Sequence, residues 1–177
     1  CAIPPVNWPI ASIFCDWRNA SCVAMSSVVR STTALSSRSL AKRKACTAAA
    51  PGEPGSNSWR GEDWKTGGGS VWMQGNYDAE TNIAYFGTGN GAPWMPDTRP
   101  GDNLYTTSVL ALDVKTGAIK GHHQYHYNDA WDWDEVSAPL LIDYERGGKK
   151  VKGLVHAGRN GYLWWLDRAD GYAYMAG

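Results

Sequence analysis

The sequence has 177 residues, enough for one domain with a hydrophobic core, and it begins at Cys1 without a Met, so we expect a piece of a larger protein. Its 17 Lys and Arg balance 17 Asp and Glu, and this neutrality argues against a surface that binds nucleic acid. The longest apolar runs are far shorter than the roughly 20 residues that a membrane-spanning helix needs, and the N-terminus lacks the basic and then apolar layout of a signal peptide. The sequence therefore predicts no nucleic-acid partner and no membrane span within this piece.

The first 50 residues differ in composition from the rest of the chain. They contain no Gly, Tyr or Glu, whereas all 20 Gly and all 9 Tyr of the sequence come later. This part is rich in Ser, Ala and Arg, and it shows neither the alternation of a strand nor the apolar stripe of a helix. Residues 1–46 stay unassigned, as either a flexible or weakly helical leader or a non-authentic segment, such as the product of a frame error upstream of about residue 43. Residues 47–177 form the predicted folded unit.

Two hairpins are predicted from alternating apolar segments joined by turn residues. SVLALD (108–113) leads through VKTG into AIKGHHQY, and YLWWLD (162–167) leads through RADG into YAYM. Both contain the phrase L-D-x-x-x-G, at Leu112–Gly117 and again at Leu166–Gly171. A repeat of about 50 residues with several strands in each copy is typical of a propeller blade.

Further segments have strand patterns and are separated by turn sequences: 70–77, 83–89, 138–144 and 153–158. No stretch is convincingly helical. The 10 Trp residues suit the dry layers between packed sheets. The sequence therefore predicts an all-β chain that holds about two propeller blades.

Oxygen donors and aromatic side chains occur together in three segments: GGGSVW (67–72), FGTGN (86–90) and NDAWDWDE (128–135). Taken singly, these segments have ordinary structural explanations as a turn, a core Trp or solvated carboxylates. In the third segment Asp132 and Asp134 alternate with Trp131 and Trp133, so on a strand the two carboxylates would share one face and the two indoles the other. Such a face is either a wet sheet surface or half of a metal site.

The chain past residue 50 resembles a known family in five segments: PGEPGSNSWRGEDWKTGGGSVW (51–72), YDAETNIAYFGTGNGAPW (77–94), RPGDNLYTTSVLALDVKTG (99–117), NDAWDWDEVSAPLL (128–141) and GRNGYLWWLDR (158–168). The sequence separations between Trp72, Asn90 and Asp132 are also similar to those in this family. The family is the pyrroloquinoline quinone (PQQ)-dependent alcohol dehydrogenases, that is, the quinoprotein methanol and ethanol dehydrogenases. The resemblance implies an eight-bladed propeller with PQQ and a metal ion on its axis, of which this chain is an internal fragment. It also implies oxidation of primary alcohols to aldehydes.

The resemblance assigns roles to individual residues. Trp72 would stack beneath the flat quinone, and Ser70 would donate to one of its oxygens. Asn90 and Asp132 would bind the metal ion, and Asp132 would in addition be the catalytic base that takes the proton of the alcohol hydroxyl. Arg159 would stabilise charge that develops on the quinone oxygens.

Asp134 bears on the identity of the metal ion. In the calcium-dependent methanol enzymes of the family this position typically holds a small residue, whereas an Asp here is similar to the lanthanide-dependent members, in which it is an additional ligand. A trivalent ion favours more anionic oxygen donors. The resemblance therefore favours a lanthanide over Ca²⁺.

The chain also departs from the family pattern. The family's metal-binding Glu should lie upstream of residue 51, but residues 1–50 contain no Glu. The adjacent-cysteine disulfide ring near the quinone is missing, and Gly121 stands where the repeat has a docking Trp. We therefore expect the isolated fragment to bind PQQ poorly and to be inactive alone.

Two other functions remain open. A non-catalytic scaffold built from the same repeats would not need Trp72, Asn90 and Asp132 at their separations. A quinoprotein sugar dehydrogenase would share the cofactor, although the segment 128–139 is more similar to the alcohol enzymes, and to the ethanol type more than to the methanol type. By resemblance, the protein would be periplasmic and would pass electrons to a cytochrome c.

Overall fold

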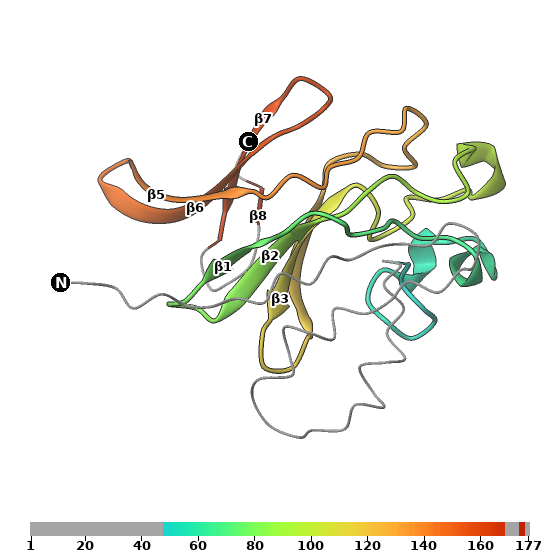
Figure 1. Ribbon diagram of the computed structural model, residues 1–177, viewed down its shortest axis with the longest axis horizontal. Helices are drawn as coiled ribbons and strands as arrows, with labels where there is room; N and C mark the ends of the chain where they lie inside the picture. Colours follow the sequence, from blue (N-terminus) through green and yellow to red (C-terminus); the bar gives the residue numbers. More distant parts are fainter. Residues whose placement is uncertain (1–47, 169–173, 176–177) are drawn as a thin grey trace.

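The computed structural model describes residues 48–168 and 174–175, so the unassigned segment 1–46 lies outside the described part of the chain. The described residues form two four-stranded antiparallel sheets (Figure 1). In each sheet the strands follow one another in sequence order, β1-β2-β3-β4 and β5-β6-β7-β8. Each sheet is therefore a simple meander, which is the arrangement of a propeller blade.

The first sheet consists of β1 (Asn76–Asp78), β2 (Ile83–Gly87), β3 (Ser108–Asp113) and β4 (Ile119–Gln124). The L-D-x-x-x-G phrase makes the turn between β3 and β4, because Asp113 Oδ1 accepts hydrogen bonds from the backbone N–H groups of Lys115 and Thr116, each at 2.9 Å. Gly117 ends the turn with a φ of 70°, in the left-handed region that favours glycine. The first predicted hairpin is confirmed.

The second sheet consists of β5 (Leu140–Arg146), β6 (Lys149–Ala157), β7 (Leu163–Asp167) and β8 (Tyr174–Met175). Gly147 and Gly148 connect β5 to β6 with φ angles of 59° and 75°, as a type I′ hairpin turn requires. Strands β7 and β8 pair antiparallel, as predicted for the second hairpin. The RADG turn between them lies largely outside the described residues.

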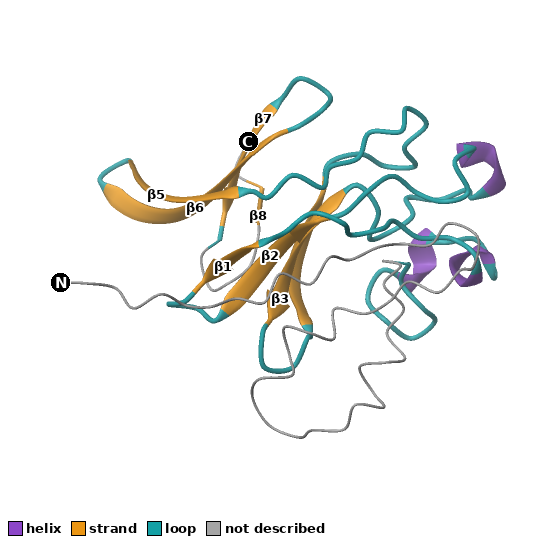
Figure 2. Ribbon diagram, viewed as in Figure 1, coloured by secondary structure: helices purple, strands orange, loops and turns teal. Residues whose placement is uncertain are grey.

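Helical structure in the described residues is limited to short 3₁₀ turns: η2 (Ser56–Ser58), η3 (Asp63–Lys65) and η4 (Pro96–Thr98). Figure 2 shows them within the loops, apart from the strands. No helix among the described residues has the length and apolar character needed to cross a membrane. The strand predicted over 70–77 is shorter than expected and begins only at Asn76, because the residues before it pass alongside the β2–β3 connection.

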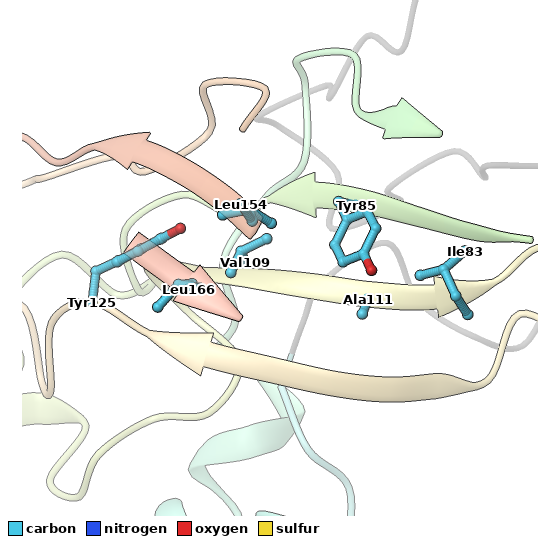
Figure 3. Packing of buried hydrophobic residues seen from close by; sticks show 7 residues of the cluster. All are labelled: Ile83, Tyr85, Val109, Ala111, Tyr125, Leu154 and Leu166. Carbon is cyan, nitrogen blue, oxygen red and sulfur yellow. The ribbon is translucent and has the colours of Figure 1, made fainter. Parts of the chain in front are cut away.

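A hydrophobic core lies between the two sheets (Figure 3). It contains residues of both: Ile83, Tyr85, Val109, Ala111, Tyr125, Leu154 and Leu166. The opposite face of β3 is covered as well, since Leu110 packs with Ala49, Trp59 and Tyr105. Because successive residues of a strand point to opposite faces, β3 is buried on both sides.

A buried cation also joins the sheets. The guanidinium of Arg168, which follows β7, donates to Asp78 of β1 and, at 2.8 Å, to Asp143 Oδ1 of β5. Burial raises the pKa of Asp78, but hydrogen bonds from Thr81 and Glu80 together with the charge of Arg168 outweigh that effect, so the pKa is lowered. The two sheets are therefore fixed to each other by charge as well as by apolar packing.

Candidate active site

The three segments that combine oxygen donors with aromatic side chains lie side by side in the structure. On one side of the β2–β3 connection, the backbone N–H of Gly89 donates to the carbonyl of Ser70 at 2.9 Å. On its other side, the carbonyl of Thr88 accepts from the backbone N–H of Glu135 at 3.2 Å. Backbone hydrogen bonds therefore hold the three segments together.

Asn90 contacts both carboxylates that the sequence analysis assigned to the metal. Its backbone N–H donates to Asp134 Oδ1 at 2.8 Å, and its side-chain Nδ2 donates to Asp132 Oδ1 at 3.1 Å. Burial raises the pKa of Asp134 and so does the charge of Asp132, while the Asn90 N–H and the charge of Arg159 lower it, with a net rise. Two carboxylates thus lie next to one amide, an arrangement that a cation would stabilise.

The segment that carries the two carboxylates, Asp132 and Asp134, does not form a strand. Residues 131–137 have no strand structure, so the alternation of Asp and Trp is not that of a sheet. Asp132 instead adopts a left-handed backbone with a φ of 60°, which is uncommon for a residue other than glycine. Trp131 and Trp133 still lie together, with ring centroids 5.7 Å apart and planes at 20°. The strand geometry considered for this segment is therefore wrong, although the carboxylates and the indoles each form a pair.

Trp72 lies against the same loop. A Cβ built on Gly89 would be 2.5 Å from Trp72 Cζ3 and 2.8 Å from Asp134 Oδ1. The lack of a side chain at Gly89 therefore lets the indole and the carboxylate approach the backbone closely. Trp72 is 40% exposed, so much of its flat surface is accessible.

Ser70 and Arg159 complete the predicted set. Ser70 is half-buried and contacts Gly89 through its carbonyl. Arg159 is exposed, its backbone N–H donates to Glu135 Oε1 at 2.9 Å, and its charge acts on neighbouring Asp134. The structure thus brings the predicted residues to one region, and their individual roles remain predictions.

Arg99 is a buried cation next to the site, and the sequence analysis did not identify this residue. Its guanidinium donates to the carbonyl of Pro93 at 2.7 Å and to the carbonyl of Asp129. Its Nη2 also lies 3.5 Å from Asn90 Oδ1. Burial lowers the pKa of Arg99, and the charge of Asp129 acts in the opposite direction. Arg99 therefore connects the loop that carries Asn90 with the loop that carries Asp132.

Glu135 is a buried carboxylate that the sequence analysis also missed. It is 1% exposed and accepts hydrogen bonds from Nε2 of His126 and Nε2 of His156, both at 2.6 Å. Burial by itself raises the pKa of Glu135, but these hydrogen bonds and the one from the Arg159 N–H outweigh it and hold the pKa at about 2. Since His126 follows β4 and His156 lies in β6, Glu135 joins both sheets behind the site.

Asp129 is the third buried charge near the site. Its Oδ1 accepts from the backbone N–H of Trp131 at 2.9 Å, and its Oδ2 accepts from that of Trp133 at 2.8 Å. An Asp that binds backbone N–H groups shortly after it is a local pattern, so this contact could have been read from NDAWDW. Arg99 and Glu135 carried no such signal, because the partners that join them to other segments, Asp129 and His156, lie 30 and 21 residues away in the sequence.

The oxygen atoms of the site suit a hard cation. Carboxylate and amide oxygens are the ligands that Ca²⁺ prefers. Asn90 presents Nδ2 to Asp132, so its Oδ1 would face a cation only after the amide rotates. Within residues 48–168 and 174–175, no group of three or more His, Cys, Asp or Glu is arranged to hold a metal. Asn90, Asp132 and Asp134 therefore supply only part of the donor set that a cation needs.

Comparison with known proteins decides the family. Residues 47–175 match the family profile described as PQQ, glucose/ethanol/alcohol dehydrogenase, beta-propeller domain. The chain belongs to this family. It is 50% identical over 120 residues to "Quinoprotein alcohol dehydrogenase PedH" of Pseudomonas putida. The matched region covers 68% of this chain and 20% of that protein. It is 43% identical over 118 residues to subunit 1 of the methanol dehydrogenase (cytochrome c) of Methylorubrum extorquens, covering 66% of this chain and 19% of that protein.

Solved structures show the same fold. Quinohemoprotein alcohol dehydrogenase from Comamonas testosteroni superposes with a TM-score of 0.66 at 35% identity, over 75% of this chain and 22% of that one. A europium-containing methanol dehydrogenase gives a TM-score of 0.64 at 36% identity, over 69% of this chain and 22% of that one. The predicted family and the partial β-propeller are thus confirmed. The chain spans about a fifth of the length of the curated relatives it matches.

Proposed function

We propose that this chain is the part of a PQQ-dependent alcohol dehydrogenase that carries the catalytic base, and that the whole protein oxidises primary alcohols to aldehydes. The observation that carries the proposal is the contact of Asn90 with both Asp132 and Asp134, next to Trp72. This contact places two carboxylates, an amide and a flat aromatic surface in one region. Membership of the family and similarity to alcohol and methanol dehydrogenases support the reaction class.

Asp132 is the proposed general base. It is exposed, so an alcohol hydroxyl can reach its carboxylate, and Asn90 Nδ2 lies 3.1 Å from its Oδ1. Asp134 is less exposed, and its Oδ1 accepts from the Asn90 backbone N–H and lies beside Gly89. The more accessible Asp132 is therefore the better acceptor for a substrate proton.

PQQ is the proposed redox cofactor, and when bound with its metal ion it supplies the hydride acceptor. The accessible face of Trp72 would hold the flat ring by stacking. Ser70 would donate a hydrogen bond to a quinone oxygen, and the guanidinium of Arg159 would stabilise negative charge there. Trp72 and Ser70 lie against Gly89, and the charge of Arg159 acts on Asp134.

A lanthanide or Ca²⁺ is the proposed metal ion, with Asn90, Asp132 and Asp134 as its ligands from this chain. Asp134 adds a second anionic oxygen donor, which favours the trivalent ion. Two relatives support this choice, because one is named a lanthanide-dependent methanol dehydrogenase and one solved structure a europium-containing methanol dehydrogenase.

The remaining features concern the whole protein. We propose a small primary alcohol as substrate, a cytochrome c as electron acceptor and a periplasmic location, in line with a relative named methanol dehydrogenase (cytochrome c). We also propose that residues 47–177 form the propeller portion and that residues 1–46 are separate from it. Because the chain covers about a fifth of its relatives, activity belongs to the whole protein and not to this piece alone.

The test uses the full-length protein that contains this chain, loaded with PQQ and either Ca²⁺ or a light lanthanide. Dye-linked oxidation of ethanol is expected, with the lanthanide giving the higher rate. Asp132→Ala should lower kcat by about 10²- to 10⁴-fold, which is the usual contribution of a general base, while PQQ absorbance is retained. Asp97→Ala, an exposed carboxylate in η4, is the matched control and should leave kcat unchanged.

Each alternative has its own outcome. Activity that survives Asp132→Ala would remove this residue as the base. Turnover of aldoses without turnover of alcohols would favour a sugar dehydrogenase, and a protein that binds no PQQ would favour a non-catalytic scaffold. Activity with Ca²⁺ and none with the lanthanide would contradict the proposed role of Asp134.

A further inference from the structure

We propose that Asp129 is a positioning residue, whose buried carboxylate fixes the backbone on both sides of Asp132 and thereby sets the orientation of the catalytic base. This inference rests on the proposed function of Asp132. Asp129 acts through that residue and has no proposed contact with substrate, cofactor or metal.

The carboxylate of Asp129 binds the two peptide N–H groups that flank Asp132. Oδ1 accepts from Trp131 at 2.9 Å, and Oδ2 accepts from Trp133 at 2.8 Å. Asp129 is 3% exposed, so little water competes for these bonds. Hydrogen bonds to an ionised acceptor are stronger than those between neutral groups. The position of Asp132 is therefore held from both sides.

Asp132 needs this support because its backbone conformation is unfavourable on its own. At a φ of 60°, the Cβ of an L-residue comes close to a carbonyl oxygen. A tight turn follows, in which the Asp134 N–H donates to the Asp132 carbonyl at 3.2 Å. Without Asp129, the backbone of Asp132 would relax to a more favourable region, and its carboxylate would move away from Asn90.

Asp129 is itself fixed to the body of the protein. The buried guanidinium of Arg99 donates to its carbonyl and interacts electrostatically with its carboxylate. Beyond it, Trp133 packs against Trp131 and against His126, whose ring centroid is 4.8 Å away. Asp132 is thus an exposed residue on an anchored loop.

The side-chain hydrogen bonds of Asp129 are local. They stay within residues 129–133 and involve neither of the two core clusters of the described residues. A substitution of Asp129 should therefore change this loop more than it changes the fold.

Asp129→Asn is the informative variant, because it keeps the size and one oxygen acceptor but places a donor against an N–H group. In the full-length protein with PQQ and Eu³⁺, kcat should fall by about 10- to 100-fold, as expected for a misplaced reacting group. The melting temperature should fall by no more than about 4 °C, and PQQ absorbance should be retained. The luminescence lifetime of Eu³⁺ should shorten, because a displaced Asp132 lets water reach the ion. Asp97→Asn is the matched control.

The Asp132→Ala background separates positioning from a general structural effect. If Asp129 acts through Asp132, Asp129→Asn causes no further change of the Eu³⁺ lifetime in that background. A further shortening there would overturn the inference, as would a wild-type kcat and lifetime for Asp129→Asn or its failure to fold. A wild-type protein that binds neither PQQ nor Eu³⁺ would instead overturn the proposed function, and this inference with it.

Discussion

Gly89 lies where three parts of the candidate site meet. Its N–H donates to Ser70, and its Cα faces the indole of Trp72 and the carboxylate of Asp134. The site therefore depends on a residue that has no side chain. A side chain at this position would compete for the space that holds the indole and the carboxylate in place.

Gly89→Ala is expected to weaken PQQ binding to the full-length protein by about 5- to 150-fold. The new Cβ would lie 2.5 Å from Trp72 Cζ3 and 2.8 Å from Asp134 Oδ1, so both groups must move. Overpacking of this kind costs about 1–3 kcal/mol, and about 1.4 kcal/mol corresponds to tenfold in a dissociation constant. Titration of the apoprotein with PQQ, followed by tryptophan fluorescence, measures the change. The control is Gly147→Asn, at a turn with open space around it, which should bind PQQ with the affinity of the wild type. An unchanged PQQ affinity in Gly89→Ala would mean that PQQ does not use Trp72.

At the scale of elements, the sequence predicts those strands and turns that depend on residues close together in the chain. The β3–β4 hairpin follows from the alternation of 108–113 and from Asp113, whose side chain binds the N–H groups of the turn. The segment 127–139 has a similar alternation but forms no strand. Its backbone N–H groups at Trp131 and Trp133 bind the Asp129 carboxylate, so they are not available for a neighbouring strand. A competing local hydrogen bond therefore overrides the alternation.

The candidate site was only partly predictable for the same reason. Trp72, Asn90 and Asp132 were found through resemblance, since no local pattern shows that they meet. Arg99 donates to a carbonyl 30 residues away, and Glu135 accepts from a histidine 21 residues away. Such contacts depend on how the loops cross after folding, which a single sequence does not reveal.

Glu135→Gln is expected to lower the free energy of unfolding at pH 7 by about 1–3 kcal/mol, because the amide keeps one acceptor for two imidazole donors. The pKa of Glu135 in the folded protein is about 2, below its usual value of 4.5. Its stabilising contribution is therefore complete above about pH 4.5 and is lost as the pH falls towards 2. Urea unfolding of the full-length protein at several pH values should show a difference from wild type that shrinks with acid. Glu145→Gln, an exposed residue of β5, is the control, and a difference that is constant with pH would contradict the linkage.

At the scale of the whole molecule, the site depends on the packing of one sheet against the other. Asn90 belongs to a loop of the first sheet, whereas Arg159 follows β6 of the second, and Glu135 binds histidines from both. The shared core and the Arg168 ion pairs determine how the sheets meet. Any change that loosens this core should therefore affect stability and site geometry together.

Leu154→Ala tests this dependence, because Leu154 lies in β6 and is fully buried in the core that both sheets share. The loss of its side chain should lower the free energy of unfolding of the full-length apoprotein by about 2–5 kcal/mol, the usual range for a large-to-small core substitution. Urea unfolding measures this change, and Lys150→Ala in the exposed β5–β6 hairpin should change it by no more than about 0.5 kcal/mol. Saturation with PQQ at about 100 times its dissociation constant should restore about 2.7 kcal/mol, provided that the variant still binds it. A loss below about 1 kcal/mol in the apoprotein would mean that the sheets do not depend on this common core.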